Sequence, residues 1–322
     1  MHLLRMLKSH VSKFIEKPLP QMTPDEAKRV DELRQRFVGL DSSDAPSGPE
    51  WQANTRRLTE LVAQQDPREF LRWDVIRRTM FVGNPPYVRD ELAYLKRQAD
   101  WTDRWESAVR EDSIGRPNPS DCHPGSSGNL IHYAYHLARF EACGQLPVDQ
   151  LKFSFEFGGG YGGMCRLFRN LGFQGTYVIF DLPHFSALQQ YYLTSIGVNV
   201  LSVDDVSPDS SGVCCISNLN DARKIMSQLD GASSSTERLF LATWSFSESP
   251  VELRSSFNEL LPKFGSISLA YQNQFSGVDN CDWFQQFQAT LGHLSWQGGH
   301  IDHLPDNYYL TGSSQSAQRS AA

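Results

Sequence analysis

The sequence predicts an α/β fold in which a mostly parallel sheet carries helices on both faces and follows an N-terminal helical region. Three observations support this prediction. Up to about residue 145, apolar residues recur at helical spacing. After Pro147, short β-rich runs alternate with helical runs. A glycine-rich turn within FEFGGGYGGM, residues 155–164, follows the first of these strands and opens a helix.

The N-terminal region contains helix start signals with a clear mechanism. Thr23, Pro24 and Glu26 supply a capping hydroxyl, a proline suited to the first turn and an acid three residues after the cap. Asp66 and Pro67 repeat the device before a second helix. We also expect a helix over 87–110 and, after a Pro- and Gly-rich connector, another over 130–143.

The second half of the chain supplies the sheet. The expected strands lie at 152–157, 176–182, 212–217, 238–245, 266–273, 295–304 and 307–312, with 199–203 as a competitor for the third. Helices are expected between them, at 163–172, 185–197, 221–229, 251–264 and 282–294. Since no helix separates the last two strands, they should form a hairpin that adds one antiparallel strand. The domain division that we predict is a helical region at 1–145, a cofactor-binding domain at 146–313 and a disordered tail at 314–322.

Composition excludes several classes of protein. The 322 residues carry a net charge of −7 and are 40% hydrophobic and 21% charged, as in an ordinary globular protein. The acidic balance argues against a nucleic-acid partner, because phosphate neutralisation needs a basic surface. There is no run of 18 apolar residues for a membrane span and no uninterrupted apolar stretch for a secretory signal, so we expect a cytoplasmic protein. The six cysteines form no C-x-x-C pair, and we interpret them as reduced.

The glycine turn and the second strand predict a nucleoside cofactor. Backbone N–H groups at the start of the following helix can face a ligand, and absent side chains let it lie against the chain. Asp181 follows the second strand, where a carboxylate can accept both hydroxyls of a ribose. The alternative is that the glycines serve only packing and that Asp181 caps the next helix. The cofactor-binding residues that we predict are Glu156, Gly158, Gly159, Gly160, Tyr161, Gly162, Asp181, Leu182 and Thr243.

Two cofactors fit this arrangement. Gly158, Gly160 and Gly163 satisfy the G-x-G-x-x-G pattern of dinucleotide-binding dehydrogenases, so an NAD(P)-dependent oxidoreductase is one hypothesis. Glu156, however, lies two residues before the glycines, where it would repel a pyrophosphate and attract an ammonium group. S-adenosyl-L-methionine has a cationic amino-acid end and no phosphate, and it is the cofactor that we favour.

A family resemblance points the same way. The segment from Glu156 to Tyr192, together with FLATWSFSESP at 240–250, AYQNQF at 270–275 and YYLTG at 308–312, resembles the sugar O-methyltransferases found among bacterial glycan-assembly genes. The resemblance covers residues 110–312. It implies a Rossmann-like class I methyltransferase with a seven-stranded sheet and an N-terminal helical region. The implied activity is transfer of a methyl group from S-adenosylmethionine to a sugar hydroxyl in polysaccharide biosynthesis.

Residues that follow the fourth and fifth strands and the terminal hairpin are the candidates for chemistry, because ligands collect at the carboxyl ends of parallel strands. Glu248 and His303 are the candidate bases, although Glu248 also suits the start of the next helix and His303 a solvated turn. Aromatic rings could stack on a sugar or belong to the core, and amides could orient hydroxyls or cap a loop. The substrate-binding residues that we predict are Trp244, Ser247, Tyr271, Gln272, Asn273, His132 and Tyr133.

No metal ligand is predicted. His132 and His136 have a spacing that suits a metal, but the sequence offers no acid at the offset of an H-E-x-x-H pattern. We therefore expect structural or substrate-facing roles for both histidines. The alternative is a divalent cation on Asp204, Asp205 and Asp209, which lie in a Ser- and Pro-rich stretch.

The sequence thus predicts an S-adenosylmethionine-dependent O-methyltransferase acting on a small sugar or a glycan precursor. A homodimer is compatible with the helical region. The alternatives are the NAD(P)-dependent oxidoreductase and a non-catalytic scaffold that keeps the cofactor fold.

Overall fold

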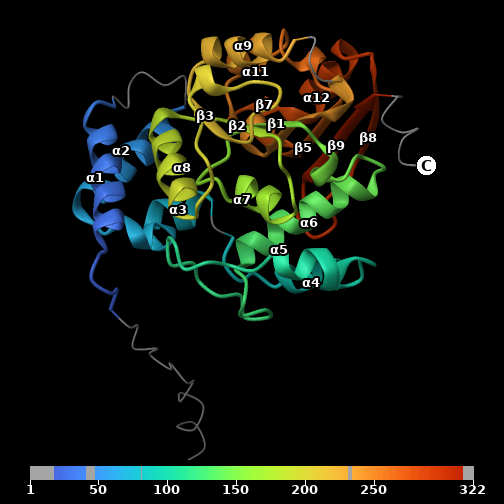
Figure 1. The fold of residues 1–322 in the computed structure, drawn as a ribbon. Helices are drawn as coiled ribbons and strands as arrows, with labels where there is room; N and C mark the ends of the chain where they lie inside the picture. Colours follow the sequence, from blue (N-terminus) through green and yellow to red (C-terminus); the bar gives the residue numbers. More distant parts are fainter. Residues whose placement is uncertain (1–17, 41–47, 81, 231–233, 315–322) are drawn as a thin grey trace, which may run out of the picture.

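A computed structural model gives the structure of this protein and describes residues 18–40, 48–80, 82–230 and 234–314 (Figure 1). Residues 1–17 of the predicted helical region lie outside the described residues, and so does the predicted tail apart from Ser314. Among the helices of the described part, none has both the length and the apolar character that a membrane crossing requires.

One seven-stranded sheet organises the molecule, in the order β3-β2-β1-β4-β5-β9-β8. The first five of its strands run parallel, whereas β9 is antiparallel to both β5 and β8. The predicted parallel sheet and its terminal hairpin are therefore confirmed. The strands are β1 (Phe153–Phe157), β2 (Thr176–Phe180), β3 (Gly212–Ile216), β4 (Arg238–Thr243), β5 (Ser266–Gln272), β8 (Leu294–His300) and β9 (Asn307–Ser314).

Two details of the sheet settle or extend the predictions. The competitor segment at 199–203 contributes only an isolated bridge between Val200 and Val213, so the third strand is the one at Gly212–Ile216. A small hairpin of β6 (Gln274–Phe275) and β7 (Val278–Asp279) follows β5 and was not predicted. Its strands have two residues each, which is too short for a periodic pattern.

Helices cover both faces of the sheet, and in Figure 1 α9, α11 and α12 lie together on one side, away from α4, α5 and α6. One face packs against α7 (Gly163–Asn170) and α8 (Pro183–Ser195), and the other packs against α9 (Leu219–Gln228), α11 (Val251–Ser256) and α12 (Asn280–Thr290). Short helices complete this half: η3 (Val148–Gln150), η4 (Val203–Asp205), η5 (Ser235–Glu237), α10 (Ser245–Glu248) and η6 (Leu261–Lys263).

The N-terminal region is helical, as predicted. At its start, Thr23 and Glu26 form a complete capping box before α1 (Pro24–Val38). The remaining helices are α2 (Pro49–Gln64), η1 (Pro67–Arg72), α3 (Asp74–Thr79), α4 (Tyr87–Lys96), η2 (Trp101–Trp105), α5 (Glu106–Ala108) and α6 (Gly128–Ala142).

The single helix expected over 87–110 is wrong, because the segment divides into α4, the π-helical turn η2 and α5. Arg104 and Trp105 both donate their N–H groups to the Asp100 carbonyl, at 2.9 and 3.5 Å. The turn buries Trp105 and directs Arg104 to Glu141 on α6, with two hydrogen bonds of 2.6 and 2.7 Å. Tertiary contacts have overridden a continuous helical pattern.

The N-terminal helices share a hydrophobic core with one face of the sheet. Buried residues of α1 to α6 form one cluster with α7, α8 and residues of β2, β3 and β4. Phe70 of η1 contacts the rings of Tyr161 and Tyr192 at 5.8 and 5.5 Å between centroids. The change of pattern near residue 145 therefore marks a change of secondary structure within a shared core.

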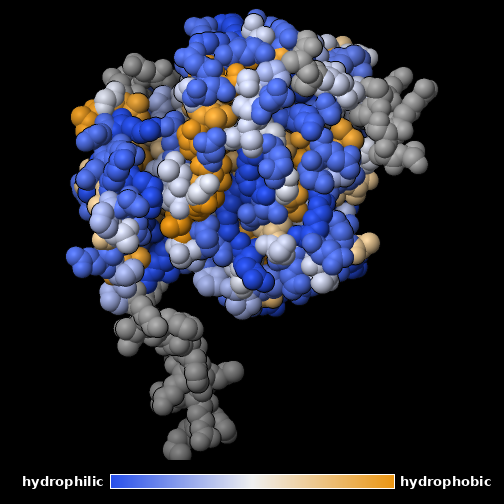
Figure 2. Space-filling model, in the orientation of Figure 1, coloured by the Kyte–Doolittle hydropathy of each residue, from blue (hydrophilic) through white to orange (hydrophobic). Residues whose placement is uncertain are grey.

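Figure 2 shows a mainly hydrophilic surface on one side of the molecule, with apolar residues gathered in a band near its middle.

Replacing Phe70 tests this shared core. We expect Phe70→Ala to destabilise the protein by about 3–5 kcal/mol, because the fully buried ring leaves a cavity between the two halves. Urea unfolding followed by tryptophan fluorescence and by far-UV circular dichroism should give one coincident transition at lower urea. Val38→Ala, at an exposed position, is the control and should leave the midpoint unchanged. Two separate transitions would contradict the shared core.

Candidate active site

A cavity of about 420 Å³ opens at the carboxyl ends of β1, β2 and β4, within the roughly 300–1,000 Å³ typical of ligand sites. The predicted site residues that line it are Glu156, Gly158, Gly159, Gly160, Asp181, Leu182, Thr243, Trp244, Glu248, His132 and Tyr133. The cavity therefore brings together residues from the glycine turn, from the turn after β4 and from α6. This is the edge of the sheet at which ligands collect in open α/β folds.

The glycine turn connects β1 to α7 and lies against other parts of the protein. Gly158 has φ +72°, and a Cβ there would lie 2.2 Å from the Cβ of Ser245. Gly160 has φ +58°, and its closest neighbour would be the flexible Met80 side chain at 3.0 Å. Gly158 is thus needed for packing against the turn after β4, whereas Gly160 leaves space that belongs to the cavity.

Asp181 connects the glycine turn to the end of β2 through hydrogen bonds. Its Oδ2 accepts hydrogen bonds from the Gly160 N–H and from the Gln189 side chain, both at 2.9 Å, and its Oδ1 accepts one from the Leu182 N–H at 2.7 Å. A carboxylate has about four acceptor directions. Asp181 already accepts three hydrogen bonds and can therefore accept about one more. From the sequence we expected it to accept two, one from each ribose hydroxyl.

Glu156 is buried beneath the glycine turn. It is 3% exposed, and its Oε2 accepts a hydrogen bond from the Tyr177 hydroxyl at 2.9 Å. Burial raises the pKa of Glu156 to about 8 and the pKa of Asp181 to about 7. Among the described residues, no arginine or lysine forms an ion pair with either acid. The base of the cavity therefore favours a positively charged ligand.

The turn after β4 is strained and firmly held. Trp244 has φ +64° and ψ −39°, a conformation that a bulky residue rarely adopts. Its indole Nε1 donates to Asn307 at 2.6 Å, and its ring stacks on His132 with centroids 5.7 Å apart. Arg254, fully buried, donates to the carbonyl groups of Ser247 and Ser249. The strain therefore presents the Trp244 ring to the cavity.

Glu248, from the same turn, is a carboxylate in the cavity wall. Burial raises its pKa above the ordinary range for glutamate, and a hydrogen bond with Gln272 partly offsets this. A carboxyl whose pKa is raised toward neutral is suited to accept a proton. The prediction of Glu248 as a base is thus compatible with its position.

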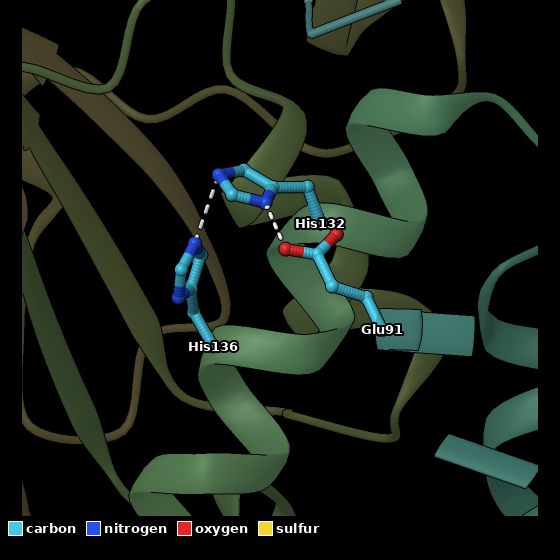
Figure 3. A group of neighbouring side chains, drawn as sticks. All are labelled: Glu91, His132 and His136. Carbon is cyan, nitrogen blue, oxygen red and sulfur yellow. Dashed lines mark hydrogen bonds and ion pairs between the residues drawn. The ribbon is translucent and has the colours of Figure 1, made fainter. Parts of the chain in front are cut away.

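The histidines form a cluster that the sequence did not reveal. Figure 3 shows His132 between two partners: its Nδ1 lies 2.6 Å from Glu91 Oε1, and its Nε2 lies 2.9 Å from His136 Nε2. The acid that was missing from the sequence pattern is therefore supplied by α4. His303 contacts the same Glu91 oxygen through Nε2 at 2.7 Å. It does not line the cavity, so the structure gives no direct path for His303 to act as the base.

Several other predicted residues also lie outside the cavity. Tyr161 is buried in the core and accepts a hydrogen bond from Asn129. Gly162 is the N-cap of α7, and a Cβ there would lie 3.1 Å from the Leu193 side chain. β5 continues to Gln272 and remains paired with β9, so the residues at its end stay in the sheet. Four predicted substrate residues at or near this strand end do not line the cavity: Ser247, Tyr271, Gln272 and Asn273.

The N-terminal helical region contributes cavity residues that sequence reasoning missed. They are Gly48, Trp51, Arg78, Thr79, Met80 and Val82. Nothing in the sequence distinguishes them from the helix-packing residues around them. The alternative cation residues Asp204 and Asp205 lie at the surface instead, paired with Lys224 and Ser202.

Glu156 should destabilise the empty protein at alkaline pH. Its pKa is raised in the folded state, so stability falls as pH rises from its ordinary value of 4.5 toward 8. We expect Glu156→Gln, which cannot ionise, to be more stable than the wild type by on the order of 3–5 kcal/mol at pH 8.5. At pH 5 the two should unfold alike. Urea unfolding at both pH values measures this, and an equal or lower stability of the variant at pH 8.5 would show that Glu156 ionises without cost.

No family model and no curated protein matches the chain. Solved structures give weak structural similarity. Magnesium protoporphyrin IX methyltransferase from Synechocystis PCC 6803 with bound SAM has 11% identity and a TM-score of 0.40, covering 77% of this chain and 95% of its own. Methanococcus jannaschii fibrillarin, a pre-rRNA processing protein, has 10% identity and a TM-score of 0.36, covering 53% and 69%. Precorrin-6y C5,15-methyltransferase from Geobacter metallireducens GS-15 has 10% identity and a TM-score of 0.35, covering 57% and 87%.

Proposed function

We propose that this protein is an S-adenosylmethionine-dependent O-methyltransferase that acts on a hydroxyl of a sugar or sugar-bearing glycan precursor. The observation that carries the proposal is the pair of acids at the glycine turn, the buried Glu156 and the half-buried Asp181. Both acids lie at the carboxyl edge of the sheet and line the same cavity. The family resemblance of the sequence supports the same conclusion.

The residues present fit this cofactor. The ammonium group of its amino-acid end would neutralise Glu156, which has no ion-pair partner among the described residues. A hydroxyl of its ribose would use the remaining acceptor capacity of Asp181. A pyrophosphate would instead meet two carboxyl groups, so NAD(P) fits less well.

The acceptor would occupy the part of the cavity bounded by the turn after β4 and by α6. Trp244 offers an aromatic face to the apolar side of a sugar ring, and Tyr133 and Thr243 offer hydroxyl groups. The cavity is also lined by Arg78, which could contact an anionic group on a larger acceptor. These features favour a polyhydroxylated ligand.

Glu248 is the residue that we assign to proton transfer. S-adenosylmethionine, when bound, supplies an electrophilic methyl group on a positively charged sulfur. Glu248 would orient the acceptor hydroxyl and take up its proton as the oxygen forms the new bond to carbon. Glu248 is only partly exposed and lines the cavity. Bulk water is therefore less able to compete for that proton.

Cofactor binding is the first test. Calorimetric titration with S-adenosylhomocysteine should show binding that strengthens as pH rises toward 8, because a bound ammonium group favours the ionised form of Glu156. Asp181→Ala should weaken this binding by on the order of 1–3 kcal/mol through lost charge-assisted hydrogen bonds. Asp209→Ala, at an exposed acid, is the matched control and should bind as the wild type does.

NADH titrated in parallel separates the alternatives. Binding of NADH alone would replace the proposal by an NAD(P)-dependent oxidoreductase. Binding of S-adenosylhomocysteine without methylation of any nucleotide sugar or monosaccharide acceptor would favour the non-catalytic scaffold. An unchanged affinity in Asp181→Ala would remove that residue from the cofactor site.

The role of Glu248 can be tested by Glu248→Gln. We expect methyl transfer to fall by about 10²–10⁴-fold, because the amide cannot accept the proton. Affinity for S-adenosylhomocysteine should stay within about twofold. Glu252→Gln, at the exposed start of α11, serves as the control. Activity close to that of the wild type in Glu248→Gln would mean that the proton leaves by another route.

A further inference from the structure

The cluster of Glu91, His132 and His136 lies in the wall between the cavity and the core. Glu91 comes from α4, and the two histidines lie one turn apart on α6, which packs against α4. All three side chains are buried, at 1%, 5% and 5% exposure. His132 also lines the cavity, so the cluster has one side open to a ligand.

The Glu91 carboxylate is contacted by two histidines and has one oxygen to spare. Among the described residues, the contacts recorded for Glu91 come from His132 and His303, and none comes from a lysine or an arginine. Its second carboxylate oxygen, Oε2, is buried without a hydrogen-bond partner. A buried carboxylate is costly unless it is paired or binds a metal ion. The unpartnered Oε2 is therefore an acceptor that a metal ion could use.

The donors have the type and spacing of a metal site. Each of the three residues offers one ligand atom, and these atoms all lie within 4.8 Å of one another. In a tetrahedral zinc site, bonds of about 2.0–2.2 Å place the donor atoms roughly 3.3 Å apart. Small shifts of the three side chains would close them around an ion. Two imidazoles and a carboxylate are a ligand set that zinc and other first-row divalent ions use in catalytic sites.

Further contacts would orient these ligands. A histidine that binds a metal through one ring nitrogen usually donates the N–H of the other to an oxygen. His136 Nδ1 contacts the Tyr309 hydroxyl, which can accept that hydrogen bond. His303 contacts Glu91 and can hold the carboxylate from behind. Both contacts come from the β8–β9 hairpin and its turn, so the C-terminal part of the sheet would support the site.

We propose that Glu91, His132 and His136 bind a divalent first-row transition-metal ion, of the zinc class, at the acceptor side of the cavity. Its role rests on the proposed function: an ion here would polarise the acceptor hydroxyl and ease the loss of its proton. His303 is then a positioning residue that acts through Glu91. In this role His303 contacts Glu91 and does not need to line the cavity.

Cobalt(II) is the probe for the test, since its visible absorption reports the ligands directly. Chelator-treated wild-type protein should bind one Co²⁺ per chain with micromolar or tighter affinity, and Zn²⁺ should displace it. Glu91→Gln and His136→Gln should each weaken Co²⁺ binding at least 100-fold. His293→Gln, a histidine remote from the cluster, is the control and should bind as the wild type does. Binding weaker than millimolar in the wild type, or unchanged in both variants, would overturn the proposal in favour of a metal-free hydrogen-bonded chain.

Two further measurements keep the outcome decisive. If either variant fails to fold, a Zn²⁺-dependent rise in the melting temperature of the wild type, with proton release on binding, supports the site, and no rise overturns it. S-adenosylhomocysteine titrated into the metal-free protein separates the two proposals. If the protein binds the cofactor analogue but not Co²⁺, the methyltransferase proposal stands and the metal site is rejected. If it binds Co²⁺ but not the cofactor analogue, the metal site stands and the methyltransferase proposal is rejected.

Discussion

The feature on which the site depends is a set of shielded acids that no lysine or arginine of the described residues pairs with. Glu156 and Asp181 lie at the glycine turn, where burial raises the pKa of both acids, and Glu91 is buried behind the acceptor side. Hydrogen bonds from backbone N–H groups, Gln189, Tyr177 and the histidines stabilise these acids only in part. A cationic ligand would favour the ionised forms of Glu156 and Asp181, so the perturbed acids mark a binding site that is suited to positive charge.

The N-terminal helices are part of the site as well as part of the core. They bury one face of the sheet through the cluster that includes Phe70, and they bring Met80 over the glycine turn. The same helical layer carries His132 on α6 and Glu91 on α4. A sheet without this layer would expose its apolar face and lose one wall of the cavity. Binding and stability are therefore coupled through the packing of α1 to α6.

The turn after β4 connects the two sides of the cavity. Ser245 packs against Gly158 on the cofactor side, while Trp244 stacks on His132 on the acceptor side. The strained backbone of Trp244 is held by Asn307 and by the contacts of Arg254 with the following carbonyl groups. A movement of this turn would affect both ligands together. Such rigidity suits a reaction that depends on the alignment of two bound molecules.

The sequence by itself determined the elements whose signals are local. Alternating strands and helices, the Thr23 cap and the glycine turn were predicted because each depends on residues close together in the chain. The terminal hairpin was predicted because no helix separates the last two strands. The position of the cavity and most of its cofactor side followed from strand ends. Only the tertiary structure decided that Glu91 joins His132 and that His303 lies behind this pair. The physical reason is that these contacts join residues 41 and 212 positions apart, and no periodic pattern in the sequence records such contacts.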